Sequence, residues 1–190
     1  LCAARVAAGM GADVTVFDVD VARMRYIDEV WGGRIGTRFS SPLAVREACG
    51  ESDVVIGSVL VPGARTPHLV DHEMVLGMVP GSVLVDVAVD QGGCFEDSHP
   101  TTHADPTFVV GGSVFYCVAN MPGAVPHSST YALTNATMRY VLLLADEGWR
   151  GSCGSRDDLR RGLATCGGKL VSAPVGEALG IECVPVSEVL

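Results

Sequence analysis

The sequence predicts an α/β fold in which a doubly wound parallel sheet is followed by C-terminal helices. Between residues 13 and 118, short β-branched runs alternate with segments of helical periodicity, as repeated β-α-β units do. Residues 82–89 (SVLVDVAV) are almost continuously apolar, which is typical of a strand covered on both faces of a parallel sheet. The 190 residues are 48% hydrophobic and 18% charged, so they can bury a core.

The alternation opens with a helix. Residues 1–12 are rich in alanine and reach Gly9 and Gly11, a typical helix end. Residues 13–19 (DVTVFDV) have the alternating pattern of a strand, and residues 20–30 return to helical spacing. A helix, a strand and a helix in this order form half of a parallel α/β unit.

The pattern then repeats. Residues 34–39 predict a strand and residues 42–49 a helix, and the next strand and helix lie at residues 53–56 and 71–78. The apolar strand at residues 82–89 follows. This order predicts a doubly wound sheet of the Rossmann type.

The character of the chain changes after the last two predicted strands, residues 107–110 and 113–118. Residues 120–126 (NMPGAVP) contain two prolines, which end regular structure, so we place a domain boundary there. Residues 1–126 are expected to form one domain and residues 127–190 part of another.

Helices dominate the C-terminal part. Residues 128–145 predict a long helix that begins with Ser and Thr capping residues, and residues 156–164 predict a second, more polar helix. Residues 169–172 carry a weak strand signal, and residues 174–179 predict a short helix.

Composition excludes several classes of protein. The net charge is −9 and no run of basic residues is longer than Arg160 and Arg161, so nucleic acid is a poor partner. The seven cysteines are scattered and never form a C-x-x-C pair, which argues against a disulfide framework or a zinc knuckle and indicates the reducing cytoplasm. No apolar run approaches the roughly 20 residues that a membrane helix needs, so no membrane partner is expected.

Asp18 is the first candidate site residue. An acid at the end of the second strand of a nucleotide-binding unit accepts hydrogen bonds from the ribose of a dinucleotide, and it favours NAD over NADP because it repels a 2′-phosphate. The alternative is that Asp18 only helps Asp20 to cap the next helix. Position alone leaves both interpretations open.

Asp90 is the strongest single candidate. It follows the apolar strand and precedes Gln91, Gly92 and Gly93, so its carboxylate reaches the ligand crevice beside backbone that can approach a ligand closely. There it could bind an ammonium group, hold a water or move a proton. The alternative is a turn-forming Asp before glycines.

Other strand ends carry weaker candidates. Ser40 follows the strand predicted at residues 34–39 and could contact an adenine, although a serine near a proline is also an ordinary turn residue. Val59 and Leu60 could lie against a flat ring or simply fill the core. Asn120 offers a donor and an acceptor for a carboxamide, and Met121 offers an apolar surface, but both could be packing residues.

No metal site is predicted. His72 begins a sequence like the H-E-x-x-H motif of zinc helices, but Leu76 stands at the fifth position. Pro100 prevents His99 and His103 from sharing one helix face.

Three strings, VDVAVDQGGCFE (85–96), PTTHADPT (100–107) and FYCVANMPGAVPHSSTYALTNAT (115–137), together resemble bacterial alanine dehydrogenase, most strongly its actinobacterial members. The likeness covers nearly the whole chain and weakens after about residue 150. It implies an NAD-dependent enzyme that interconverts L-alanine with pyruvate and ammonia, acting as a homohexamer. It also implies that residues 1–126 are most of an NAD-binding domain and that residues 127–190 belong to the substrate domain.

The resemblance also implies roles for particular residues. Asp90 matches a catalytic residue of the family, and Asp18 matches its ribose-binding acid. The positions that match cofactor contacts are Asp18, Arg23, Ser40, Val59, Leu60, Val87, Ala88, Val89, Asp90, His99, Val118, Ala119, Asn120 and Met121. The family usually has Arg where this chain has His99, so we expect NAD affinity to be weaker or pH-dependent here.

The chain begins with Leu1 rather than Met, and the glycine-rich phosphate loop expected before Asp18 is not in it. The family's substrate-binding Arg and Lys and its catalytic His belong to an N-terminal domain that this sequence also lacks. We therefore expect a C-terminal fragment that is inactive alone. Two alternatives remain: the nucleotide-binding subunit of a nicotinamide nucleotide transhydrogenase, which typically has Glu in place of the Asp90-Gln91 pair, and a non-catalytic NAD-binding remnant.

Overall fold

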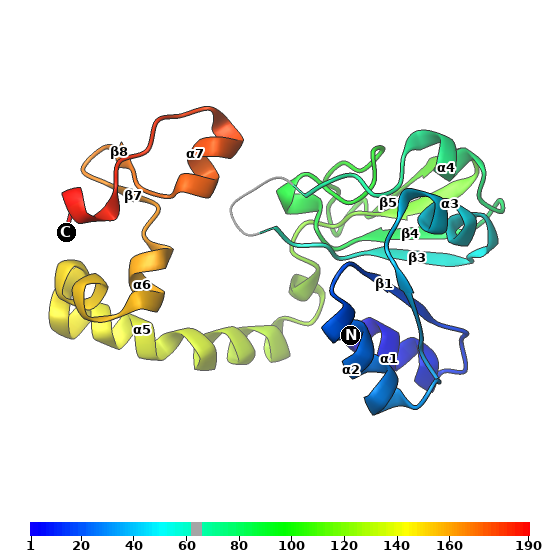
Figure 1. The fold of residues 1–190 in the computed structure, drawn as a ribbon, viewed down its shortest axis with the longest axis horizontal. Coiled ribbons are helices and arrows are strands. Elements are labelled where there is room, and N and C mark those ends of the chain that lie inside the picture. Colours follow the sequence, from blue (N-terminus) through cyan, green and yellow to red (C-terminus); the bar gives the residue numbers. More distant parts are fainter. Residues whose placement is uncertain (62–65) are drawn as a thin grey trace.

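A computed structural model describes residues 1–61 and 66–190 (Figure 1). Helices and strands alternate through the first part of the chain, which confirms the predicted α/β class. The helices are α1 (Cys2–Gly9), α2 (Val21–Trp31), α3 (Pro42–Glu51), α4 (His72–Leu76), α5 (Pro126–Ser155), α6 (Asp157–Gly162) and α7 (Ala173–Leu179). The strands are β1 (Thr15–Asp18), β2 (Gly36–Phe39), β3 (Val54–Gly57), β4 (Val83–Asp86), β5 (Thr107–Val110), β6 (Ser113–Tyr116), β7 (Thr165–Cys166) and β8 (Lys169–Leu170). Short 3₁₀ helices are η1 (Val89–Gln91), η2 (Met121–Ala124) and η3 (Val186–Glu188).

The strands of the first part form two sheets. β1 pairs with β2 in parallel, and a second sheet has the strand order β3-β4-β6-β5. β3, β4 and β6 run parallel, and their register places Gly57 beside Asp86 and Val85 beside Tyr116. The carboxyl ends of these three strands therefore meet at one edge.

β5 departs from the parallel pattern. It pairs with β6 in the antiparallel direction, with Val110 opposite Ser113. Gly111 and Gly112 connect the two strands, and both have positive φ (58° and 90°). Only a tight turn of this kind fits two residues between paired strands, and it forces the chain to reverse. The expectation of a wholly parallel sheet is wrong for this edge strand.

Side-chain caps set where the helices begin. The Oδ1 atom of Asp20 accepts hydrogen bonds from the backbone N–H groups of Ala22 (2.9 Å) and Arg23 (3.2 Å) at the start of α2. Ser41 caps α3, and Asp71 caps α4 through a 2.7 Å bond from the Met74 N–H. These acceptors satisfy N–H groups that the first helical turn leaves unpaired.

The main core lies between the second sheet and helices α3 and α4. Leu84 of β4 and Phe115 of β6 are neighbours in the register and are completely buried. Val75 of α4 covers them, and Phe95 meets Phe115 edge to face at 6.1 Å between ring centroids. This packing fixes the sheet edge on which the candidate residues stand.

The strand predicted at residues 82–89 ends early, at Asp86. Beyond it the Ala88 N–H bonds to the Asp86 side chain (3.0 Å) rather than to a neighbouring strand, and the chain turns into η1. The apolar residues Val87 and Ala88 thus form a loop, and Val89 begins η1. The interpretation of residues 82–89 as one strand is wrong for its last three residues because hydropathy does not distinguish an apolar loop from a strand.

The long helix is longer than predicted. α5 runs from Pro126 to Ser155 but contains a break at Gly148, whose φ and ψ are 69° and 163°. The Ser152 hydroxyl donates to the Leu143 carbonyl at 3.0 Å across this break. The glycines of residues 146–155 hid the helical continuation, so the prediction stopped at residue 145.

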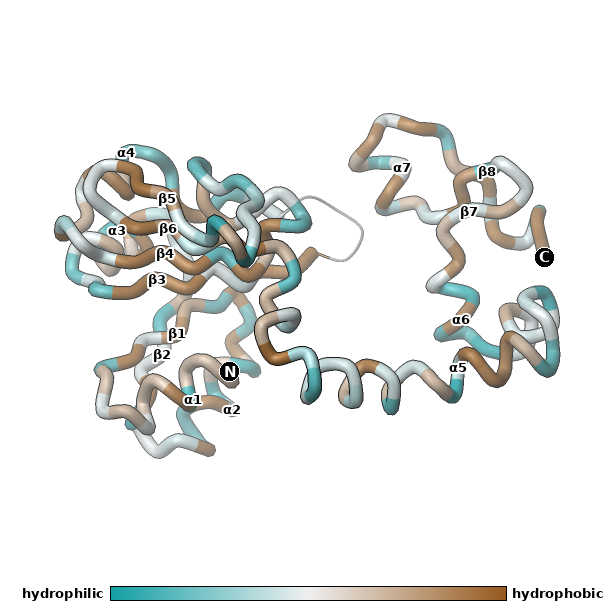
Figure 2. The backbone as a smooth tube through the Cα atoms, turned by 180° about the vertical axis from the view of Figure 1, so that it is seen from behind, coloured by the Kyte–Doolittle hydropathy of each residue, from teal (hydrophilic) through white to brown (hydrophobic). Residues whose placement is uncertain are grey.

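α5 carries the chain away from the sheets to a small C-terminal part built of α6, α7 and the β7-β8 pair (Figure 1). Apolar stretches are visible along α5 in Figure 2, and Tyr131, Met138 and Leu142 are about half exposed or more. Spacings of seven and four residues put these three side chains on one face. Within the described ranges, no helix has both the length and the apolar composition to cross a membrane.

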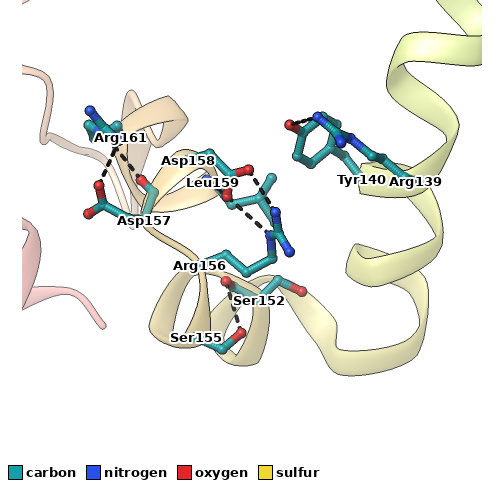
Figure 3. A network of polar contacts seen from close by, with 9 residues as sticks. All are labelled: Arg139, Tyr140, Ser152, Ser155, Arg156, Asp157, Asp158, Leu159 and Arg161. Atoms are coloured by element: carbon teal, nitrogen blue, oxygen red, sulfur yellow. Dashed lines mark hydrogen bonds and ion pairs between the residues drawn. The ribbon is translucent and has the colours of Figure 1, made fainter.

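Charged side chains pair with one another at the start of α6 (Figure 3). Arg156 forms a two-pronged contact with Asp158 through Nε (3.1 Å) and Nη2 (2.9 Å), and Arg161 pairs with Asp157. The Arg156 guanidinium holds the pKa of the Asp158 carboxyl well below its usual range. These groups are exposed, so the network orients the turn more than it stabilises the fold.

Gly57→Ala is expected to lower the free energy of unfolding by about 1–3 kcal/mol. A Cβ at this position would lie 2.6 Å from the Cys94 Cβ and 2.9 Å from the Phe95 Cζ, where β3 supports the following loop. Urea unfolding of the 190-residue chain measures the loss. Gly50→Ala in α3 is the control, since a Cβ there would lie 4.0 Å from its nearest neighbour, the Gly77 carbonyl oxygen. Equal stability of the two variants would contradict the prediction.

Candidate functional site

The sequence-predicted residues fall into two groups. Asp18 and Ser40 lie together at the ends of β1 and β2, where the Ser40 N–H donates to the Asp18 carbonyl at 2.9 Å. The other group surrounds the ends of β3, β4 and β6. Among the described residues, no strand ladder joins the two sheets. The position of each group is therefore set by a different sheet.

The Asp18 carboxylate is oriented by the chain that follows it. Its Oδ1 atom accepts hydrogen bonds from the N–H groups of Val19 (2.7 Å) and Asp20 (3.0 Å). Asp20 alone caps α2. The Oδ2 atom makes no hydrogen bond with any residue that the structure describes, so it can accept one from a ligand hydroxyl. Arg23 lies in the first turn of α2, with its guanidinium 5.7 Å from the Tyr26 ring.

The second group includes apolar side chains that the fold leaves uncovered. Leu60 after β3 is 62% exposed and Val87 after β4 is 52% exposed. The Val87 N–H donates to the Gly57 carbonyl at 2.8 Å, which ties the two strand ends together. Val59 is half-buried and packs against the core. Leu60 and Val87 thus give this edge an apolar surface that could contact a flat ring.

Asp90 lies in η1 and is exposed, whereas Ala88 and Val89 before it are buried. It does not directly follow a strand, as the sequence interpretation had it, but sits four residues past the end of β4. Its carboxylate forms no hydrogen bond within the described ranges. Gly92 after it takes φ 100°, a value that favours glycine, and turns the chain back toward the sheet.

Asp86 is a residue that the sequence interpretation missed. It is completely buried at the end of β4. Besides the Ala88 N–H, its carboxylate accepts from the N–H groups of Cys94 (2.7 Å) and Phe95 (3.4 Å) and from the Ser98 hydroxyl (2.5 Å). The available signal was an acid inside an apolar run, because a buried carboxylate must have donors close by.

Asn120 follows the end of β6 in a left-handed conformation (φ 59°, ψ 51°), unlike every other non-glycine residue that the structure describes. Its carbonyl accepts from the Gly123 N–H at 2.8 Å and lies 3.1 Å from His103 Nε2. A carbonyl can only accept, so Nε2 carries the proton. Strained backbone of this kind gathers at functional sites. Val118 before it is buried, while Ala119 and Met121 are half-buried.

Thr101 attaches the chain after Ser98 to the end of β6. Its N–H donates to the Cys117 carbonyl (2.9 Å), and its carbonyl accepts from the Ala119 N–H (3.2 Å). His99, two residues earlier, stacks on Phe108 with 3.8 Å between ring centroids. One face of the His99 ring is therefore covered by protein, and the rest of the side chain is exposed.

The buried thiols are poor nucleophiles. Burial raises the pKa of both Cys94 and Cys117. Both therefore stay protonated near neutral pH. All seven cysteines are free, and no cluster of His, Cys, Asp or Glu within the described ranges could hold a metal ion.

Two surface hollows are lined by none of the candidate residues, although the second lies beside Arg23 and Ser40. One, of about 590 Å³, lies beside β7, β8 and α7, and is lined by Lys169, Leu170 and Ile181 among others. The second, of about 450 Å³, lies between α2 and β2. The candidate residues instead lie at the carboxyl ends of the strands of the two sheets.

Comparison with known protein families identifies the family of this chain. The family "Alanine dehydrogenase/PNT, C-terminal domain" matches residues 1–173. The chain belongs to this family. It is 57% identical over 188 residues to an alanine dehydrogenase of Mycolicibacterium smegmatis and 54% identical to one of Mycobacterium tuberculosis, in each case over 99% of this chain and 51% of the relative. The chain thus spans about half the length of the curated relatives it matches.

Solved structures support the same family and a Rossmann-like fold. An L-alanine dehydrogenase superposes with a TM-score of 0.81 at 45% identity, covering 94% of this chain and 49% of that one. A transhydrogenase from Sinorhizobium meliloti superposes less well, with a TM-score of 0.65 at 28% identity over 90% of this chain and 46% of that one. The family's shared fold is therefore confirmed, and the likeness to alanine dehydrogenase is the stronger.

A further set of contacts joins the start of α4 to the segment after Gly92 and Gly93. The His72 N–H donates to Glu96 Oε2 at 2.8 Å, and His72 Nδ1 lies 3.0 Å from both oxygens of Asp97. The Asp97 carboxylate raises the pKa of His72, and Glu73 and Glu96 act in the same direction. The pair joins the start of α4 to the segment that follows the glycines.

We expect this pair to stabilise the chain in acid and not in base. A raised folded-state pKa means that the stabilisation is fully present below about pH 6.5 and is lost as the pH rises through the folded pKa. His72→Gln should lower the melting temperature by about 1–2 °C at pH 5.5 and leave it unchanged at pH 9. Thermal unfolding at both pH values measures this, with His127→Gln on α5 as the control. A deficit of the same size at both pH values would contradict the prediction.

Proposed function

We propose that these 190 residues are the NAD-binding half of an alanine dehydrogenase, which interconverts L-alanine with pyruvate and ammonia. The observation that carries the proposal is the 57% identity to the Mycolicibacterium smegmatis alanine dehydrogenase over nearly all of this chain. Residues 1–126 would form the NAD-binding domain, and residues 127–190 would contribute to the substrate domain.

The residues present fit a dinucleotide. The Oδ2 atom of Asp18 is available to a ribose hydroxyl, and a carboxylate there disfavours the 2′-phosphate of NADP. Arg23 and Ser40 lie at the same end of the β1-β2 sheet as Asp18. The exposed apolar side chains of Leu60 and Val87, together with the segments Val87–Asp90 and Val118–Met121, suit the nicotinamide end. His99 would contact the cofactor with the ring edge that Phe108 leaves uncovered.

NAD, when bound, accepts a hydride from the Cα of alanine. Asp90 would hold the substrate amine, or the water that later attacks the oxidised carbon, since its exposed carboxylate is free to accept protons from either. Asn120 would orient the nicotinamide carboxamide, because its side chain offers both a donor and an acceptor. The left-handed backbone at Asn120 keeps this side chain at the strand edge.

A transhydrogenase subunit is the second candidate. The S. meliloti structure has the fold, but its identity to this chain is 28% against 45% for the alanine dehydrogenase structure. The Asp90-Gln91 pair also departs from the Glu expected in transhydrogenases. Both observations favour alanine dehydrogenase.

We also propose that the protein is a homo-oligomer, a hexamer as the family resemblance implies, in the cytoplasm. The exposed face of α5 formed by Tyr131, Met138 and Leu142 supports an assembly, because a row of apolar side chains on a long helix is stabilised by burial against another surface. The seven free cysteines are consistent with a reducing compartment.

A chimera tests the activity. Residues 1–190 would replace the region they match in the M. smegmatis enzyme, and NADH formation from L-alanine and NAD would be followed by absorbance. We expect activity in the chimera and none in the 190-residue chain alone. The rest of the relative, about half of its length, is needed to complete the site. A folded chimera that binds NAD without turnover would favour the transhydrogenase or remnant alternatives.

Asp90→Asn in this chimera should lower kcat about 10²- to 10⁴-fold and change the NAD dissociation constant less than about threefold. The amide keeps the size of the side chain but cannot take up a proton. Asp105→Asn, at an exposed position two residues before β5, is the matched control and should leave both values unchanged. Parallel losses of turnover and NAD affinity would assign Asp90 a structural role instead.

A further inference from the structure

The carboxylate of Asp86 holds both ends of one loop. We define the Asp90 loop as residues 87–98, which leave β4 and return beneath it. All four donors to Asp86 come from this loop: the Ala88 N–H before Asp90, and the Cys94 N–H, the Phe95 N–H and the Ser98 hydroxyl after it. The path of the chain at Asp90 is therefore set by one buried group.

We propose that Asp86 is a positioning residue for the reaction, acting on Asp90 through the loop without touching substrate or cofactor. The proposal rests on the proposed function, since it assigns Asp86 a part in the work of Asp90. Asp86 is completely buried, whereas Asp90 is exposed. The two acids thus have different tasks: one shapes the loop and the other meets the ligand.

The Asp86 carboxylate acts as an acceptor in every hydrogen bond that it makes. Four groups donate to its two oxygens, and no Lys, Arg or His side chain among the described residues pairs with it. Hydrogen bonds to an ionised acceptor are about twice as strong as neutral ones. Removal of the carboxylate would leave buried N–H groups of the loop without an adequate acceptor. The carboxylate is therefore held in place by the loop, and the loop by the carboxylate.

Close packing around the carboxylate supports the same role. Gly93 has φ 81°, and a Cβ there would lie 2.8 Å from Asp86 Oδ2 and 2.8 Å from the Ser98 Cβ. The backbone at Gly93 thus presses directly against the carboxylate. A larger side chain at residue 93 would push the loop away from Asp86. This explains why glycine, rather than a larger residue, follows Gly92.

The same anchor reaches the Asn120 segment. The Ser98 hydroxyl that donates to Asp86 also lies 3.8 Å from the Cys117 sulfur, and three residues later Thr101 bonds to the backbone at Cys117 and Ala119. Displacement of Ser98 would disturb the chain on which Asn120 stands. Asp86 therefore couples the two segments proposed to flank the nicotinamide.

Ser98→Ala tests the proposal with little risk to folding, because it removes one donor and leaves Asp86 bonded to the backbone. Ser113→Ala is the matched control: it removes a buried hydroxyl, bonded to Ser82 at 2.8 Å, from the opposite end of β6. Ser98→Thr retains the hydroxyl and serves as the rescue variant. Asp86→Asn is the stronger variant, expected to have larger effects in the same direction where it folds.

Two readouts are needed. In the 190-residue chain, hydrogen exchange of the Ala88, Cys94 and Phe95 amides should become about tenfold faster in Ser98→Ala and stay unchanged in Ser113→Ala. In the chimera, Ser98→Ala should lower kcat about tenfold with a smaller change in the alanine KM, and Ser98→Thr should recover most of the loss.

Unchanged exchange in Ser98→Ala would overturn the proposal, and so would faster exchange with undiminished kcat. Equal losses of kcat in Ser98→Ala and Ser113→Ala would also overturn it, since a general loss of stability would then explain both. An inactive wild-type chimera would instead refute the proposed function. The exchange data alone would then decide whether Asp86 holds the loop.

Discussion

Parallel pairing of β4 between β3 and β6 is the constraint on which the candidate site depends. It brings Gly57, Asp86 and Tyr116 to one edge of the sheet. The three segments that leave this edge carry the residues proposed to bind the nicotinamide and the substrate, whereas Asp18, Arg23 and Ser40 lie at the end of the β1-β2 sheet. The core below, centred on Leu84, Phe115 and Val75, holds the strands in register. Since hydrophobic packing fixes the edge, the loops above it are free to carry polar groups.

The loops gain their shape from hydrogen bonds that the sheet itself does not make. Asp86 binds the inside of the Asp90 loop, and the pairing of His72 with Asp97 binds its outside to α4. The inner contact is buried and the outer one is exposed, so the inner contact should contribute more to loop order. Asp90 lies between these anchors with its carboxylate exposed.

Much of this architecture was predictable from local pattern. The caps at Asp20, Ser41 and Asp71 and the alternation of strands and helices have local causes. Apart from the C-terminal end of α5, the predicted elements lie within a few residues of the observed ones. Hydropathy could not distinguish Val87–Val89 from a strand, since an apolar loop and an apolar strand have the same composition. The reversal at Gly111 and Gly112 and the helix beyond Gly148 depend on backbone angles that glycine alone does not specify.

The candidate site was less predictable than the fold. Asp18, Asp90 and Asn120 could be named from their places after strands, but their matching to a family was needed to choose between site and turn. Asp86 and Ser98 were not identified because three of the four contacts of Asp86 join residues eight or more positions apart. His103 escaped because its partner, the Asn120 carbonyl, lies across the edge of the sheet.

A crystal structure of the chimera with NAD tests the central claim most directly. The account predicts the ribose on the carboxylate of Asp18, the nicotinamide between Val87–Asp90 and Val118–Met121, and Asp86 bonded to the Asp90 loop as it is in the free chain. A cofactor bound elsewhere, or an Asp90 loop that leaves Asp86 when NAD binds, would contradict it.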